Sequence, residues 1–168
     1  MQLFFTFAIT VFHSKQTTMP QKETKVLSVN ISEKKGTIKH PVDYIELFEK
    51  GVKNDAHSGK WHRQVSLLAR ESIDKSSKAI NREIKFGEFA ENITTDGIVL
   101  YETKPGDRFL IGETEMEVTQ IGKKCHSGCE IFKQVGNCVM PKEGIFAKVI
   151  KFGRIKAGDV IVYKASCG

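Results

Sequence analysis

Four cysteines give the chain its most distinctive chemistry, because three of them lie close together. The first, Cys125, follows Lys123 and Lys124 and precedes His126. A thiol reacts as the thiolate, and neighbouring cations stabilise that form. Cys125 is therefore the candidate reactive cysteine. Buried, inert cysteines are also common, and the local sequence alone does not decide between the two.

The same segment allows a zinc site. Thiolate and imidazole are zinc ligands, and both are supplied by Cys125, His126, Cys129 and Cys138. No second Cys-x2-Cys or His-x3-His pair completes a usual ligand set, so structural zinc stays an open alternative. The clustering also argues against a secreted disulfide framework, and we expect a reducing, cytoplasmic location.

A second candidate cluster lies in a polar loop that holds His57, His62 and Arg63. Apolar side chains recur with a helical period in the segment that follows, which predicts a helix over residues 64–81. Basic side chains beside a helix N-terminus bind phosphate well. The loop is therefore a candidate anion site. The alternative is a polar loop in which a histidine packs on Trp61.

A third group of polar side chains lies in residues 87–92. Glu88, Glu91 and Asn92 could form hydrogen bonds or act as general bases, although acidic loop residues are mostly just solvated. The sequence contains no glycine-rich phosphate loop, nucleotide fingerprint or catalytic-triad signature.

Short strands must position most of these residues. Alternating apolar side chains and glycine turns recur along the chain, and two Lys-x-Gly-Asp runs each lead into an apolar strand. The predicted strands are residues 25–31, a pair within 37–48 interrupted at Pro41, 108–111, 115–120, 145–150 and 160–162. This pattern predicts a mainly β, barrel-like fold with one or two helices packed outside.

The length of 168 residues fits one domain, which we place at residues 24–164. We expect residues 1–23 to be a disordered or misassigned extension, with Met19 as a second possible start, and residues 165–168 to be a tail. The first twelve residues are apolar but too short to span a bilayer, and they lack the flanks of a signal peptide. A weak membrane anchor is the alternative.

A net charge of +6 favours anionic partners. The aromatic residues are not interleaved with lysines, so we do not expect nucleic acid to be the partner. We also expect no membrane partner.

Five blocks occur in an order that resembles the MOSC domain family, named after the C-terminal domain of molybdenum-cofactor sulfurase. The resemblance is strongest to its short, stand-alone bacterial members and covers roughly residues 24–164. The blocks are Asp-Ala-His-Ser-Gly…His-Arg-Gln-Val-Ser-Leu-Leu (55–68), Gly-Glu-Phe-Ala-Glu-Asn-Ile (87–93), Gly-Lys-Lys-Cys-His (122–126), Pro-Lys-Glu-Gly-Ile-Phe-Ala (141–147) and Ala-Gly-Asp (157–159).

The resemblance implies a β-barrel-like domain whose important cysteine matches Cys125. Family members are thought to carry sulfur on this cysteine or to bind the molybdenum cofactor (molybdopterin), and Cys125 could also ligate molybdenum. The cofactor-binding residues would be His57, His62, Arg63, Asn92, Lys123, Lys124 and His126.

The implied partners are cofactor-biosynthesis proteins and a cysteine desulfurase as sulfur donor. The activity would be sulfurtransferase-like or that of a cofactor-dependent reductase, as in larger relatives that reduce N-hydroxylated compounds. A non-catalytic chaperone for the cofactor is the alternative. Pyridoxal phosphate is not predicted, because no lysine carries a recognisable motif for it. The chain departs from the family at Asn54, where glycine is frequent, but asparagine tolerates the left-handed backbone that glycine adopts.

Overall fold

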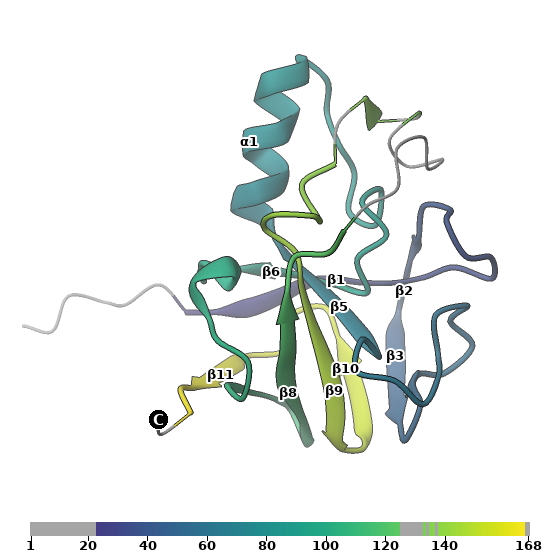
Figure 1. The fold of residues 1–168 in the computed structure, drawn as a ribbon, viewed down its shortest axis with the longest axis vertical. Helices are drawn as coiled ribbons and strands as arrows, with labels where there is room; N and C mark the ends of the chain where they lie inside the picture. The colour runs from purple at the N-terminus through teal and green to yellow at the C-terminus, as the bar shows by residue number, and fades with distance from the viewer. Residues whose placement is uncertain (1–22, 125–132, 134, 137, 167–168) are drawn as a thin grey trace, which may run out of the picture.

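The computed structural model describes residues 23–124, 133, 135–136 and 138–166, which form two sheets and an outer helix (Figure 1). The larger sheet has the order β11-β7-β8-β9-β5-β6-β1-β2, and the smaller has the order β10-β3-β4. The larger comprises β1 (Lys25–Ile31), β2 (His40–Val42), β5 (Val65–Ala69), β6 (Ile93–Asp96), β7 (Arg108–Ile111), β8 (Thr114–Ile121), β9 (Ile145–Lys151) and β11 (Ile161–Lys164). The smaller comprises β3 (Tyr44–Phe48), β4 (Gly51–Val52) and β10 (Gly153–Lys156).

The larger sheet curls until its two sides meet. The amide of Val26 on β1 donates to the carbonyl of Asp159, and the carbonyl of Val26 accepts from the amide of Gly158, both at 2.9 Å. The amide of Ile161 on β11 donates to Thr24 at 2.8 Å. These bonds connect β1 to the segment that enters β11, so the mainly β, barrel-like prediction is confirmed.

Two apolar clusters lie on opposite faces of this curled sheet. The larger fills the interior with side chains from both sheets, among them Val29, Leu47, Leu67, Phe109 and Ile155. The smaller lies outside and joins α1 (Arg70–Ile80) to the sheet through Leu68, Ile73, Phe89, Met140 and Phe146. Adjacent strand residues point to opposite faces, which is why Leu67 and Leu68 belong to different clusters.

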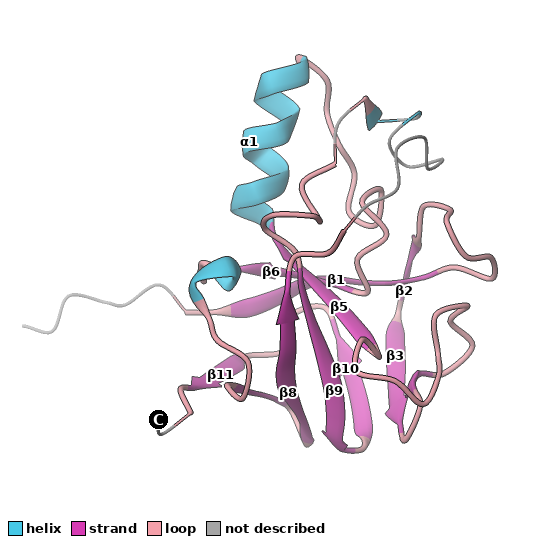
Figure 2. Cartoon of the chain, in the orientation of Figure 1, coloured by secondary structure: helices cyan, strands magenta, loops and turns pink. Residues whose placement is uncertain are grey.

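The predicted helix over 64–81 is wrong in its first part. Residues Val65–Ala69 form β5, which pairs with β6 in parallel and with β9 antiparallel, and all five residues are buried. A strand buried on both faces has a continuous apolar sequence, and over so few residues its pattern also fits a helical period. Figure 2 shows α1, which begins at Arg70 and ends at Ile80. Asn81 follows with a left-handed backbone (φ 50°) and forms the C-cap.

Other predicted strands are found with small changes. Pro41 lies within β2, opposite Asn30, and not in a break; β2 is an edge strand, where proline is tolerated. The two Gly-Asp turns do lead into strands. In each, the aspartate accepts a hydrogen bond from the lysine amide three residues earlier, at 2.7 Å for Asp107 and 2.9 Å for Asp159. A short 3-10 helix, η1 (Leu100–Glu102), follows β6.

Candidate functional site

Asn92, one of the predicted site residues, lies in a row of paired residues that crosses the larger sheet. Register places Ser66 of β5 opposite Phe146 of β9, and Phe146 opposite Gln120 of β8. On the other side, the amide of Asn92 donates to the carbonyl of Ser66, and the amide of Asn30 donates to the carbonyl of Asn92. One transverse row therefore runs from β1 to β8 and ends two residues before Gly122.

The side chain of Asn92 forms hydrogen bonds within this row through both its oxygen and its nitrogen. Its Oδ1 accepts from the amide of Ser66 at 3.2 Å and from the Ser66 hydroxyl at 3.0 Å. Its Nδ2 donates to the carbonyl of Asn30 at 3.1 Å. Asn92 therefore ties β1 to β5 at the point where β6 begins.

Glu91, beside it, is completely buried. Its Oε1 accepts from the amide of Gly87 and from the hydroxyl of Thr94, while Oε2 has no hydrogen-bond partner among the described residues. Burial raises the pKa of the Glu91 carboxyl to about 7, although the hydrogen bonds it accepts oppose the shift. Glu91 is thus a buried carboxyl that binds its proton more tightly than an ordinary glutamate does, and not the solvated acid that its sequence suggests.

The loop before β5 carries the two predicted histidines and is held by Gln64. The Gln64 Nε2 donates to the carbonyls of Glu49 at 2.8 Å and Gly59 at 3.3 Å. Its Oε1 accepts from the amide of Val149 on β9 at 2.8 Å. Asn54 has a left-handed backbone (φ 63°), as predicted for the position where the family often has glycine. Because the loop leads into a strand, the predicted contribution of a helix N-terminus to anion binding is wrong.

His57 lies against a buried ion pair that the sequence did not reveal. Lys39 and Asp55 have side chains that are each 1% exposed, and Lys39 Nζ contacts Asp55 Oδ2. Lys39 Nζ also lies 3.4 Å from Nδ1 of His57, whose amide donates to Asp55 Oδ1 at 2.9 Å. Burial lowers the pKa of Lys39, and attraction to Asp55 opposes the shift. Burial would raise the pKa of Asp55, but contacts with His57 and Lys39 hold it well below its usual range.

His62 and Arg63 extend the site toward β8 and β9. His62 Nε2 lies 2.9 Å from Oε1 of Gln120, at the end of the polar row. The guanidinium of Arg63 lies over two rings, 4.6 Å from the centre of Trp61 and 5.6 Å from that of Phe146. Its buried Nε has no hydrogen-bond partner in the described part of the chain. An unpaired donor on a cation is suited to an anionic ligand.

The segment leading to the cysteine begins where β8 ends. Gly122 has a left-handed backbone (φ 64°), and its amide donates to the carbonyl of Gly144 at 2.7 Å. Lys123 is partly buried and acts electrostatically on Lys39, while Lys124 is exposed. Two further predicted site residues, Cys125 and His126, lie outside the described residues.

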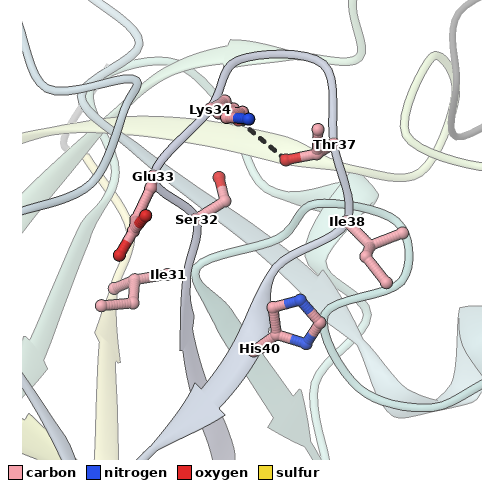
Figure 3. Close-up of a pocket in the computed structure, with 7 residues that line it drawn as sticks. All are labelled: Ile31, Ser32, Glu33, Lys34, Thr37, Ile38 and His40. Atoms are coloured by element: carbon pink, nitrogen blue, oxygen red, sulfur yellow. Dashed lines mark hydrogen bonds between the residues drawn. The ribbon is translucent and has the colours of Figure 1, made fainter.

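A separate hollow lies beside the ion pair, under the loop that joins β1 to β2 (Figure 3). It has a volume of about 420 Å³ and is lined by Ile31, Ser32, Glu33, Lys34, Thr37, Ile38 and His40. The backbone of Ser32 connects it to the site, since its amide donates to Asp55 Oδ2 at 3.1 Å and its carbonyl accepts from Ala56 at 2.8 Å.

The described residues bring no three His, Cys, Asp or Glu side chains together in a way that could hold a metal ion. The alternative zinc site is not tested by this observation, because Cys125, His126 and Cys129 lie outside the described residues. Cys138 is partly buried. Within the described residues, no helix is both long and apolar enough to cross a membrane.

Fold and site together define a class: a curled β domain in which a loop with His57, His62 and Arg63 leads into a sheet that is crossed by a row of paired residues. A model of the MOSC domain matches residues 54–162. The chain belongs to the MOSC domain family, which is associated with molybdenum-cofactor binding and sulfur chemistry.

Solved structures share this fold at low sequence identity. The YuaD protein from Bacillus subtilis has a TM-score of 0.73 at 16% identity, over 85% of this chain and 97% of that one. YiiM from Geobacillus stearothermophilus has a TM-score of 0.66 at 20% identity, over 84% and 75%. YiiM from Escherichia coli has a TM-score of 0.61 at 20% identity, over 86% and 70%. No curated protein matches the chain significantly.

The close approach of Gly122 to the chain opposite generates a first prediction. A Cβ at this position would collide with the carbonyl oxygen of Pro141, and L-residues strain at this positive φ. We expect Gly122→Ala to lower the free energy of unfolding by about 2 kcal/mol or more. Gly36→Ala is the matched control, since Gly36 has a positive φ (78°) but open space around it. Urea unfolding that gives equal losses for the two variants would contradict the collision.

Burial of Glu91 generates a second prediction. Its pKa is about 7 in the folded chain and near 4.5 when exposed, so only the folded chain holds this proton between those pH values. The stability that Glu91 contributes is therefore greatest below about pH 4.5 and falls as the pH rises to 7, by about 3 kcal/mol. Glu91→Gln, which cannot ionise, should flatten that part of the pH profile of urea unfolding. An unchanged slope in the variant would refute the assignment.

Proposed function

We propose that this chain binds the molybdenum cofactor at the site described above and uses Cys125 to carry sulfur for it or to ligate its metal. One observation supports the proposal most strongly: the half-buried guanidinium of Arg63 lies near the rings of Trp61 and Phe146, and its Nε has no partner among the described residues. Lys123, which acts electrostatically on Lys39, adds a positive charge near the ion pair of Lys39 and Asp55.

The described residues suit a pterin that carries a phosphate. Arg63 offers an unpaired donor and a delocalised charge, which suits a phosphate oxygen. His57 and His62 lie on the same loop. The side chain of His57 is 31% exposed, and His62 is exposed. The cofactor would supply a redox-active molybdenum centre, for which a cysteine thiolate is a suitable soft ligand. We assign Asn92 to holding these groups in place, because its amide is engaged within the sheet.

The role of Cys125 as a sulfur carrier follows ordinary thiolate chemistry. Its thiolate would attack the outer sulfur of a persulfide on a cysteine desulfurase, and the donor cysteine would leave as a thiolate. Cys125 would then hold the persulfide, with no net oxidation. Lys123, Lys124 and His126 would stabilise the thiolate, because they place positive charge beside it in the sequence. We further propose that this takes place in the cytoplasm, with cofactor-biosynthesis proteins as partners.

Two alternatives have different signatures. A chaperone would bind the cofactor without sulfur transfer or turnover, whereas a sulfurtransferase-like enzyme or a reductase would turn over. A zinc protein would lose its fold when the metal is chelated.

Replacement of Cys125 tests the sulfur role. We expect Cys125→Ser to reduce persulfide loading from a cysteine desulfurase to background, because the hydroxyl of serine cannot form a persulfide. Trapped persulfide would be measured by intact-protein mass spectrometry, and circular dichroism would check the fold. Cys167→Ser is the control, since Cys167 lies beyond the residues that match the family model. Full loading of Cys125→Ser would refute the sulfur-carrier role.

A further inference from the structure

The contact between Lys39 and His57 bears on which nitrogen of the histidine carries a proton. Lys39 Nζ lies 3.4 Å from Nδ1 of His57. A protonated lysine has three N–H donors and no lone pair. An ammonium group this close to a ring nitrogen is therefore favourable only when that nitrogen presents its lone pair.

The protein holds Lys39 in this position from several sides. Its side chain is 1% exposed and its amide donates to the carbonyl of Gly87 at 2.8 Å. Asp55, to which it is paired, also accepts from the amide of Ser32. A buried ammonium group cannot withdraw into water, so it stays between the carboxylate and the imidazole.

Asp55 offers a competing arrangement. Its Oδ1 lies 3.5 Å from Nδ1 of His57 and could accept a hydrogen bond from an N–H on that nitrogen. This oxygen already accepts from the amide of His57 at the much shorter distance of 2.9 Å, and Oδ2 is occupied by Lys39 and Ser32. An N–H on Nδ1 would also point its positive end toward the Lys39 charge. The geometry thus favours an Nδ1 that carries no proton and presents its lone pair to Lys39.

We propose that Lys39 is a positioning residue that fixes neutral His57 as the tautomer protonated on Nε2. His57 then presents an N–H donor to the site, and not a lone pair. The ligand chemistry that such a donor recognises is an oxyanion, such as a phosphate oxygen. This consequence rests on the proposed function, whereas the tautomer itself is a property of the chain alone. Other charges that act on Lys39 are those of Glu91 and Lys123.

The tautomer can be read directly by nitrogen-15 NMR of the full chain labelled on its histidine rings. At about pH 8, where an ordinary imidazole is neutral, we expect a pyridine-type shift for Nδ1 of His57 and a pyrrole-type shift for Nε2. The signals would be assigned by their loss in His57→Gln. In Lys39→Met the proton of neutral His57 should move toward Nδ1, because the ammonium group is gone and the carboxylate of Asp55 remains near that nitrogen. A proton on Nδ1 in the unaltered chain would overturn the proposal, even if Lys39→Met fails to fold.

Titration with inorganic phosphate separates this inference from the proposed function. We expect Lys39→Met to bind phosphate about tenfold more weakly, the scale of one charge-assisted hydrogen bond. Lys53→Met removes the same charge at an exposed lysine that pairs with Glu46, and it should bind as the unaltered chain does. Equal weakening in both variants would reduce the effect to net charge and would overturn the role of Lys39 in binding. If Nε2 carries the proton but phosphate does not bind, the proposed anion site fails and the tautomer assignment stands.

Discussion

The ion pair of Lys39 and Asp55 is the constraint on which the arrangement of the site depends. Both side chains are almost fully removed from water, and neither charge would be tolerated there alone. Loss of one partner of such a buried pair typically costs about 3–5 kcal/mol, because the other charge is left without compensation. The loop between β1 and β2 and the loop before β5 must therefore stay together, although Lys39 and Asp55 are 16 residues apart.

The sheet turns this local constraint into a defined surface. Asn92 ties β1 to β5, and register carries the row onward through Phe146 to Gln120, two residues before the segment that ends in the cysteine. Strands hold side chains more rigidly than loops do, so the row gives His62 and Arg63 of the neighbouring loop fixed partners in Gln120 and Phe146. The outer apolar cluster excludes water from one side of the row and strengthens its electrostatic interactions.

The sequence predicted the strands better than it predicted the site. Alternating apolar residues and Gly-Asp turns are local signals, and the strands they predict are present. The segment Val65–Ala69 misled because both of its faces are buried, so apolar residues do not simply alternate with exposed polar ones and their pattern also fitted a helix. The left-handed backbone of Asn54 was predictable because it depends on one residue type.

Lys39 was missed because its burial depends on Asp55, and no local pattern distinguishes it from the exposed Lys34 and Lys35. The burial of Glu91 was equally hidden, since acidic loop residues are usually solvated. Contacts between distant segments determine both environments. The fold-level resemblance brought His57, His62 and Arg63 into consideration, but only the structure shows which side chains orient them.

The central claim is that this face of the protein holds the molybdenum cofactor. Elemental mass spectrometry of the full chain, purified from cells that make the cofactor, tests it most directly. The account predicts close to one molybdenum per chain, with little zinc. Stoichiometric zinc without molybdenum, or neither metal, would contradict it.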